Sequence, residues 1–279
     1  MAELTPEIRE RRRGGLGGSD APVVFGVGGW GSPFSLWASK TWGDGDDKTS
    51  PQQQRGHDLE TMIAEKVARK HGIRDLYPGG WNDHPEHRFM FANLDYEDRE
   101  ATIIECKATD YGWKGYEWGD DGDPDGLPAR IDFQVHHQLE VCRAELCIVG
   151  VLFVDTWELR TYEIKPDPEL AALIVNGERN FWESYVIPQV PPPVTDGPSA
   201  WDALRALSAR PDSSVDLPTE TNDLIGELLT TAATRLLNEK REKHLKAEIG
   251  RLLGDAEHGY IDGEKAVEFK NVAGGNRRL

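Results

Sequence analysis

Residues 146–154 form an uninterrupted apolar run, flanked by Glu145 and Asp155, and residues 146–153 (LCIVGVLF) are the expected strand within it. A run of this length predicts a buried strand, and it is far too short to cross a bilayer. Apolar spacing elsewhere predicts helices at 58–70 and 131–144 and strands at 88–95 and 101–107. Helical and strand-like segments alternate here without low-complexity sequence, so we expect an α/β domain.

A proline-rich stretch divides the chain. Residues 188–198 contain five prolines, which exclude a helix or central strand there and favour an extended segment. We therefore expect an α/β domain at 1–190, a proline-rich linker at 191–219 and a C-terminal arm at 220–279. In the arm, apolar residues at spacings of three and four predict a long amphipathic helix. Asp262-Gly263 predicts the turn of a small β-hairpin.

The charge balance is acidic, with 49 Asp and Glu against 32 Lys and Arg and a formal net charge of −17. An acidic surface binds nucleic acid poorly, because Lys and Arg make the phosphate contacts. Local clusters such as Arg11, Arg12 and Arg13 can still bind phosphate, and a protein that holds divalent metal ions needs acidic ligands. The charge therefore weighs against DNA binding without excluding it.

The sequence also disfavours disulfide-stabilised, zinc-binding and secreted proteins. Cys106, Cys142 and Cys147 form neither an even set nor a CxxC pair, so we expect no disulfide framework and no zinc ribbon. The histidines do not show HExxH spacing, and we assign no zinc to them. The N-terminal residues are charged, so no signal peptide is expected. We expect a cytoplasmic protein.

Asp95, Glu105 and Lys107 form the pattern that points to chemistry. Residues i and i+2 of a strand share a face, so Glu105 and Lys107 should project side by side, and a hairpin-like return should bring Asp95 next to Glu105. Carboxylates placed together are expensive to bury without a cation. Mg²⁺, with Mn²⁺ as an alternative, prefers such hard oxygen ligands and activates a bound water. Lys107 could orient that water, take its proton or stabilise charge on the phosphate.

The order of short motifs along the chain adds information that no single motif carries. The motifs are GLGGSDA, SPFSLW, RGHDLE, HPEHRFMFANLD, IIECK and FQVHHQLEV. In this order the chain resembles the YqaJ-like viral recombinase family, relatives of phage lambda exonuclease within the PD-(D/E)xK nuclease superfamily. The resemblance covers about residues 12–190. It implies an α/β restriction-endonuclease-like core with a mixed central sheet flanked by helices, followed by the helical arm and the hairpin.

The resemblance implies roles for residues at matching positions. Glu60 would support a second metal ion, and the backbone carbonyl of Cys106 would join the two carboxylates as a metal ligand. Gln134 and Gln138 would form a QxxxQ element on one helix face, and we include both in the catalytic set. Ser19 in the GGSD turn, with Arg12 or Arg13, would bind the phosphate at a DNA end.

Some features leave alternatives open. A glycine-rich turn suits phosphate binding, but the segment around Ser19 could also be an ordinary tight turn. The chain has Asn-Leu-Asp-Tyr at 93–96, where the family usually shows Pro-Asp or Pro-Asp-Gly. The insert at 111–128 is strongly acidic, which is unusual for a loop that faces DNA. Trp113 and Trp118 within it could wedge against bases.

The resemblance implies a Mg²⁺-dependent deoxyribonuclease that removes nucleotides from ends of linear duplex DNA, with 5′ to 3′ polarity. It also implies a single-strand annealing protein as partner and a possible homo-oligomer, with no membrane association. An endonuclease or nickase on the same core is one alternative. A non-catalytic DNA-binding or DNA-mimicking protein is the other, and the net charge keeps it open.

Overall fold

The computed structural model describes residues 6–27, 31–43, 50–114, 117–123, 125–195, 197–206, 214–271 and 277–278. The chain divides into two compact units, Met1–Ala209 and Arg210–Leu279. Among the described residues, no helix is both long enough and apolar enough to cross a membrane.

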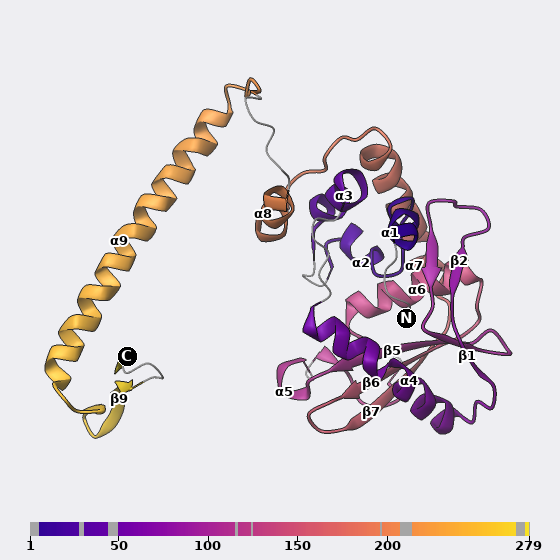
Figure 1. The fold of residues 1–279 in the computed structure, drawn as a ribbon, viewed down its shortest axis with the longest axis horizontal. Coiled ribbons are helices and arrows are strands. Elements are labelled where there is room, and N and C mark those ends of the chain that lie inside the picture. The colour runs from indigo at the N-terminus through magenta and orange to yellow at the C-terminus, as the bar shows by residue number, and fades with distance from the viewer. Residues whose placement is uncertain are drawn as a thin grey trace. The chain divides into compact units, whose positions relative to one another are not determined.

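The first unit is built on a five-stranded mixed sheet in the order β1-β4-β5-β6-β7 (Figure 1). The strands are β1 (Leu76–Pro78), β4 (Tyr96–Asp98), β5 (Ile103–Thr109), β6 (Cys147–Phe153) and β7 (Glu158–Ile164). β5 and β6 are parallel, and the other neighbouring strands are antiparallel. β6 is buried along its whole length, as its apolar run predicts. The α/β class and the mixed sheet flanked by helices are confirmed.

Helices α4 (Pro51–His71) and α6 (Ala129–Cys142) pack on opposite faces of the sheet. Even-numbered residues of β5 and β6 pack with α4, and odd-numbered residues pack with α6. Gly150 lies where α4 crosses β6, and a Cβ there would be 2.3 Å from Cγ2 of Val67. The close approach of α4 to the centre of the sheet therefore requires glycine at this position.

Helix α4 begins earlier than the expected start at residue 58. Ser50 and Gln53 form a reciprocal capping box, and Pro51 occupies the first turn. The apolar stripe begins only further along, at Leu59, so apolar spacing alone placed the helix start too late. Glu60 consequently lies in the middle of α4 and not at its beginning.

The strand expected at 88–95 is also different in the structure. Residues Phe91–Asn93 form β3, which pairs with β2 (Trp81–Asp83) in a separate two-stranded sheet. The chain bends at Leu94, whose backbone N–H donates to the carbonyl of Gly80. Asp95 therefore lies between β3 and β4, and β4, which follows it, forms the hairpin with β5.

Several of the remaining helices of the first unit contribute side chains to a second apolar cluster. The remaining helices are α1 (Pro6–Arg13), α2 (Ala21–Val24), α3 (Pro33–Trp42), α5 (Tyr111–Lys114), α7 (Pro168–Phe181), the π-helix Trp182–Val186 and α8 (Gly197–Ala206).

Part of the stretch 191–219, where we expected a linker, is folded, because it contains helix α8. Ala200 of α8 is buried in one apolar cluster with Trp37 and Val186. A proline near the start of a helix costs no hydrogen bond, so Pro198 is compatible with α8 although it was counted with the linker prolines.

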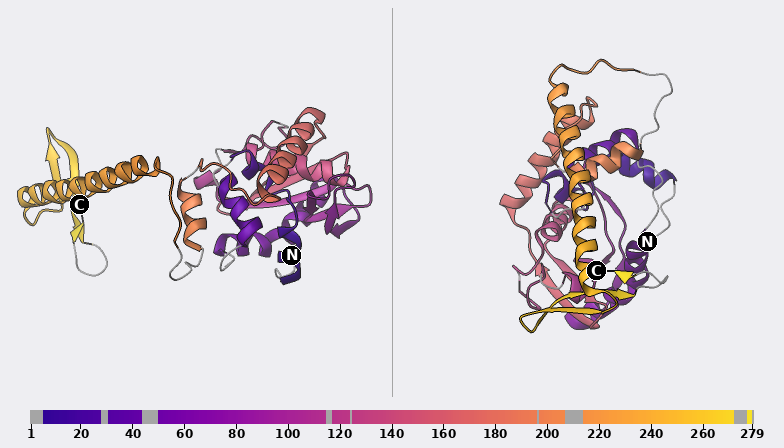
Figure 2. Two further views of the ribbon diagram at one scale, coloured as in Figure 1. Left: turned by 90° about the horizontal axis from the view of Figure 1, so that it is seen from above. Right: turned by 90° about the vertical axis from the view of Figure 1, so that its left-hand side faces the viewer.

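The second unit contains α9 (Thr221–Leu253) and a hairpin of β8 (His258–Ile261) and β9 (Glu264–Glu268), which lies across the C-terminal end of α9 (Figure 2). The short strands β10 (Lys270–Asn271) and β11 (Arg277–Arg278) follow. Asp262 and Gly263 form the hairpin turn with φ angles of 51° and 86°. The predicted C-terminal helix and small hairpin are confirmed.

A buried ionisable pair joins α6 to α7. His137 Nδ1 lies 2.8 Å from Glu178 Oε1, and both side chains are fully buried. His137 Nε2 lies 2.8 Å from the carbonyl oxygen of Phe91. That oxygen can only accept, so Nε2 donates, and the bond to Glu178 contains one further proton. Burial lowers the pKa of His137, but the charge of Glu178 and the hydrogen bonds outweigh it and raise the pKa. Burial also raises the pKa of Glu178.

His137→Ala is expected to reduce the free energy of unfolding by about 3–5 kcal/mol, because it leaves the Glu178 carboxylate buried without a partner. Replacing both residues by apolar ones, His137→Leu with Glu178→Met, should restore most of the loss. Urea unfolding measures both. Equal destabilisation by the single and double variants would contradict this account.

The same pair predicts a pH dependence with a definite sign. Both pKa values are raised, so the folded protein keeps the shared proton to higher pH than the unfolded chain does. The stability that the pair contributes is present at low pH and is lost as the pH rises above 6.5, the usual pKa of histidine. The free energy of unfolding of the wild type should therefore fall relative to that of the double variant as the pH rises above 6.5.

Candidate active site

Glu105 and Lys107 lie side by side on the face of β5 that is covered by α6. Lys107 Nζ is 2.5 Å from Glu105 Oε1. Glu105 is buried, whereas a quarter of the Lys107 side chain (25%) is exposed. Cys106 points to the opposite face and packs in the cluster under α4. The strand geometry therefore places one carboxylate inside the protein and an ammonium group between it and solvent.

Helix α6 supplies two more donors to Glu105. Gln134 Nε2 donates to Oε1 at 2.7 Å, and Gln138 Nε2 donates to Oε2 at 2.8 Å. With Lys107, three donors therefore fix the orientation of this carboxylate. The Oε1 atom of Gln138 is buried and has no hydrogen-bond partner among the described residues. A buried acceptor of this kind is suited to a water molecule or a hydrated ion beside Glu105.

Asp95 faces the same site from the segment before β4. Its Oδ2 accepts a hydrogen bond from the backbone N–H of Cys106 at 2.9 Å. Burial raises the pKa of Asp95 well above its usual range, and the negative charges of Glu105 and Glu60 raise it further, against the opposing charge of Lys107. The site therefore concentrates more negative charge than its one ammonium group compensates. Burial lowers the pKa of Lys107, but the charges of Glu105 and Asp95 outweigh burial and raise it.

Glu60 of α4 lies near these groups, since its charge acts on Asp95. His57 Nδ1 is 2.8 Å from Glu60 Oε1, and Thr61 Oγ1 is 2.8 Å from the hydroxyl of Tyr96. The second contact joins α4 to the residue that follows Asp95. In the part of the chain that is described, Glu60, Asp95 and Glu105 are not a triad with all ligand atoms within 4.8 Å of one another.

The oxygen atoms at this site fit a hard divalent cation. The N–H and C=O groups of one strand residue point to the same edge, so the Cys106 carbonyl faces the side on which Asp95 accepts its N–H. Two carboxylates and a carbonyl, with water and a substrate phosphate, form the ligand set typical of Mg²⁺.

The turn around Ser19 lies against the same helix. A Cβ on Gly18 would be 3.2 Å from Gln138 Cγ and 3.3 Å from Gln134 Cγ, so the turn packs closely on the QxxxQ face. Ser19 itself is exposed. Asp20 holds the turn by accepting from the backbone N–H of Gly17 at 2.9 Å. The structure therefore brings Ser19 beside the helix that orients Glu105.

Lys40 of α3 contacts this turn, and the sequence did not predict that contact. Its Nζ donates to Asp20 Oδ2 at 2.7 Å and to the carbonyl oxygen of Arg12 at 2.9 Å. Burial raises the pKa of Asp20, but Lys40 and then Arg12 act in the opposite direction and lower it. No local pattern links Lys40 to Asp20, so one sequence gave no signal for this contact.

The two arginines assigned to phosphate binding have different surroundings. The charge of Arg12 acts on Asp20, which places it near the Ser19 turn. Arg13 lies 3.5 Å from Glu10, and its guanidinium is near Gly43. Of the two, Arg12 is better placed for a phosphate at Ser19.

Comparisons with known proteins identify the family. The model of the YqaJ-like viral recombinase domain matches residues 8–145. The uncharacterized protein YqaJ of Bacillus subtilis (strain 168) is 30% identical over 270 residues, which cover 91% of this chain and 80% of that protein. The chain belongs to the YqaJ-like viral recombinase family.

Solved structures show that this YqaJ-family chain shares its fold with an exonuclease. The alkaline exonuclease LHK-Exo from Laribacter hongkongensis matches with a TM-score of 0.54 and 20% identity, over 67% of this chain and 94% of that one. The structure of LHK-Exo in complex with dAMP matches with the same TM-score, 19% identity and the same coverage. The predicted resemblance is thereby confirmed at the level of family and fold.

The acidic insert of this YqaJ-family chain is largely structural. Trp118 is buried in the core, with its ring 5.7 Å from that of Tyr162, so the expectation that it wedges against bases is wrong. Asp121 accepts from Lys70 at 2.5 Å and from the backbone N–H of Thr161 at 2.8 Å. The side chain of Trp113 lies outside the described residues.

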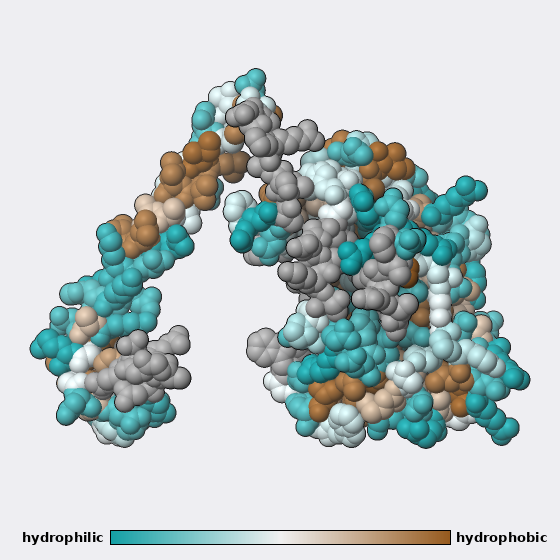
Figure 3. Space-filling model, viewed as in Figure 1, coloured by the Kyte–Doolittle hydropathy of each residue, from teal (hydrophilic) through white to brown (hydrophobic). Residues whose placement is uncertain are grey.

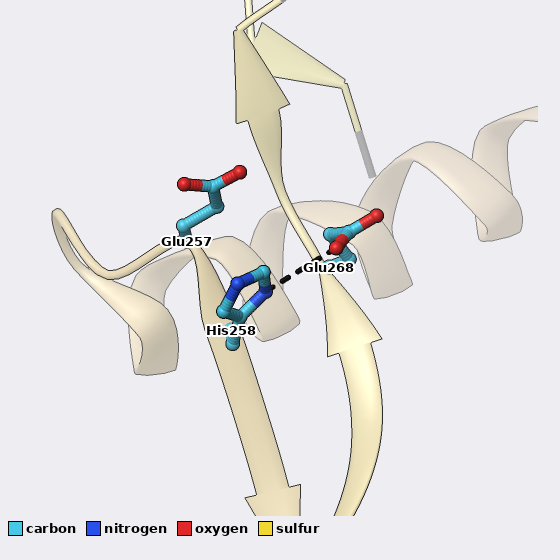
Figure 4. A group of neighbouring side chains, drawn as sticks. All are labelled: Glu257, His258 and Glu268. Carbon is cyan, nitrogen blue, oxygen red and sulfur yellow. Dashed lines mark ion pairs between the residues drawn. The ribbon is translucent and has the colours of Figure 1, made fainter.

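A second group of ligand-type side chains lies on the C-terminal hairpin. Glu257, His258 and Glu268 have ligand atoms within 4.8 Å of one another (Figure 4). However, hydrogen bonds from Lys270 and Lys265 lower the pKa of Glu268 to about 2. The group is largely exposed, and two ammonium groups already neutralise its central carboxylate. We assign no metal to it.

Gln138→Ala is expected to slow DNA cleavage by about 10- to 100-fold, the usual effect of losing a residue that orients a metal ligand. The variant removes the donor to Glu105 Oε2 and the unpartnered Oε1. Gln54→Ala is the matched control, because Gln54 donates to Asp58 on the exposed part of α4. Steady-state cleavage of linear duplex measures both, and equal rates for the two variants would contradict the role of Gln138.

Proposed function

We propose that this protein is a metal-dependent DNA exonuclease that removes nucleotides from the ends of linear duplex DNA with 5′ to 3′ polarity. The observation that carries the proposal is the set of Asp95, Glu105 and Lys107, in which the Glu105 carboxylate accepts hydrogen bonds from Lys107 and from the two glutamines of α6. Membership of the YqaJ-like viral recombinase family and the fold shared with LHK-Exo support it. dAMP, present in one LHK-Exo structure, belongs to the product class that an exonuclease releases.

In this proposal Asp95, Glu105 and the Cys106 carbonyl hold Mg²⁺, with Mn²⁺ as a substitute, and Glu60 assists a second ion. When bound, the metal would supply an activated water and polarise the scissile phosphate. Gln134 and Gln138 keep the Glu105 carboxylate in the orientation needed to bind the ion. Burial and the negative charges of Glu105 and Glu60 raise the pKa of Asp95, and a bound cation would offset the repulsion between these charges.

In this proposal Lys107 acts as a cation and not as the base. Its raised pKa keeps it protonated in the metal-free site, where its Nζ donates to Glu105. An ammonium group cannot accept a proton, but it can orient the attacking water and stabilise charge that develops on the phosphate. Its exposed quarter gives it access to the substrate side of the site.

Ser19 and Arg12 are proposed to bind the phosphate at the DNA end. The turn that carries Ser19 packs on Gln134 and Gln138, so a terminal phosphate there would lie next to the scissile region. By the family resemblance, we further propose that the exonuclease works with a single-strand annealing protein in phage-type recombination.

The test is digestion of a linear duplex labelled at one end and bearing a 5′-phosphate, with Mg²⁺ or with EDTA, beside a covalently closed circle. Release of nucleotides from the 5′ ends of the linear DNA alone, abolished by EDTA, is the expected result. Release from the 3′ ends would reverse the polarity, and cutting of the circle would assign an endonuclease or nickase. Failure to cleave any DNA with Mg²⁺ or Mn²⁺ would overturn the enzyme and favour a binding or DNA-mimicking protein.

A further inference from the structure

The N-terminal half of α9 presents a wide apolar surface. No residue described in α9 is buried. Its large apolar residues are each between 45% and 67% exposed, namely Leu224, Ile225, Leu228, Leu229, Leu236 and Leu237. Figure 3 shows hydrophobic surface along this half of the helix and hydrophilic surface on the turns that follow. A helix of this kind is normally stabilised by packing its apolar face, and a contiguous exposed patch marks an interaction site.

The C-terminal part of α9 is different, because the hairpin covers part of it. A Cβ on Gly259 of β8 would be 2.8 Å from Leu253, and a Cβ on Gly250 would be 3.4 Å from Phe269. The hairpin therefore covers the last turns of α9 and leaves the apolar surface at 224–237 uncovered within the second unit.

Charge is distributed unequally along the same helix and the segment before it. Residues 214–234 contain four acidic residues, Asp216, Glu220, Asp223 and Glu227, and no Lys or Arg. Residues 235–246 contain five basic residues, Arg235, Lys240, Arg241, Lys243 and Lys246, against two acidic ones. Two such helices in parallel would place acid beside acid. An antiparallel arrangement would place the acidic half of each beside the basic half of the other.

The apolar residues fit the same antiparallel arrangement. They occur as four adjacent pairs, at 224–225, 228–229, 232–233 and 236–237. In one antiparallel register the facing residues of two copies are Leu224 with Leu237, Ile225 with Leu236, Leu228 with Ala233 and Leu229 with Ala232. Large residues at the centre thus face small ones, which allows the helices to interdigitate.

We propose that α9 pairs antiparallel with α9 of a second copy of this chain, forming a symmetric dimer through residues 224–237. A self-complementary surface with its two-fold axis near residues 230 and 231 is the pattern of an isologous interface, the commonest arrangement in homo-oligomers. The inference rests on α9 alone and is independent of the proposed nuclease activity.

Sedimentation velocity of the full chain tests the dimer. The wild type is expected to shift from monomer to dimer with concentration in the micromolar range. Leu228→Glu with Leu229→Glu should raise the dimer dissociation constant by at least about tenfold, since each substitution occurs twice at the centre of the interface. The matched control, Thr234→Glu, adds a charge on the opposite side of the same helix and should leave the equilibrium unchanged.

These residues are already exposed, so the substitutions should not unfold the chain, and circular dichroism verifies that. A wild type that stays monomeric throughout would overturn the proposal and indicate that another partner, or the rest of this chain, covers α9. A dimer that the double variant leaves intact would also overturn it.

Cross-linking tests the orientation. A mixture of Ile225→Cys and Leu236→Cys chains should form a disulfide between the two variants on mild oxidation, above the level of wild type with its native cysteines. Ile225→Cys alone should not cross-link to itself. Self-linking of Ile225→Cys without linking to Leu236→Cys would establish parallel helices and overturn the antiparallel arrangement.

Discussion

Lys107→Ala is expected to reduce the rate of metal-dependent DNA hydrolysis by about a thousandfold, with little loss of DNA binding. The substitution removes the ammonium group that lies 2.5 Å from Glu105 and belongs to a partly exposed side chain. Its contribution is made to charge that develops during the reaction, so the loss should appear in the chemical step. Single-turnover cleavage with saturating linear duplex measures that step, and fluorescence anisotropy with EDTA measures binding.

Lys70→Ala is the matched control for Lys107. Lys70 also pairs with a carboxylate, that of Asp121 at 2.5 Å, but on the exposed surface. The Lys70→Ala substitution removes the same charge from the protein. It should change the cleavage rate by less than about threefold, because exposed ion pairs contribute little. A Lys107→Ala rate within tenfold of wild type, in a variant with an unchanged melting temperature, would contradict the proposed role.

The parts of this site that follow from short-range geometry could be predicted. Glu105 and Lys107 are two residues apart in a strand, and Gln134 and Gln138 are four apart in a helix, so each pair must share a face. That the two faces meet, with three donors on Glu105, is seen only in the structure. Whether these residues perform catalysis stays a prediction until the variants are measured.

Contacts between distant segments could not be predicted. Lys40 and Asp20 are 20 residues apart, and His137 and Glu178 are 41 apart. Each pairing depends on how helices pack, and no local pattern records that. The start of α4 was misplaced for a different reason, since its capping box at Ser50 precedes the apolar stripe by more than two turns.

Asp95→Asn is expected to stabilise the metal-free protein while abolishing cleavage. Burial and the charges of Glu105 and Glu60 raise the pKa of Asp95 well above its usual 3.8. A raised pKa means that the protonated form stabilises the fold below that usual value and that this stability is lost as the pH rises through the raised pKa. At neutral pH the ionised carboxylate therefore destabilises the fold. Asparagine removes the charge and can still accept the hydrogen bond from the Cys106 N–H.

The melting temperature in EDTA should rise by roughly 2–4 °C, the shift that about 1 kcal/mol produces in a chain of this size. Mg²⁺ should raise the melting temperature of the wild type, because ligands that bind the folded state stabilise it, but not that of the variant.

Asp98→Asn is the matched control, since Asp98 accepts from backbone N–H groups of Glu100 and Thr102 in the turn after β4. It should neither stabilise the protein nor remove its response to Mg²⁺. If Asp95→Asn lowered the melting temperature in EDTA, or kept the full Mg²⁺ response, Asp95 would not be the proposed metal ligand, and the role of the whole carboxylate pair would have to be reassigned.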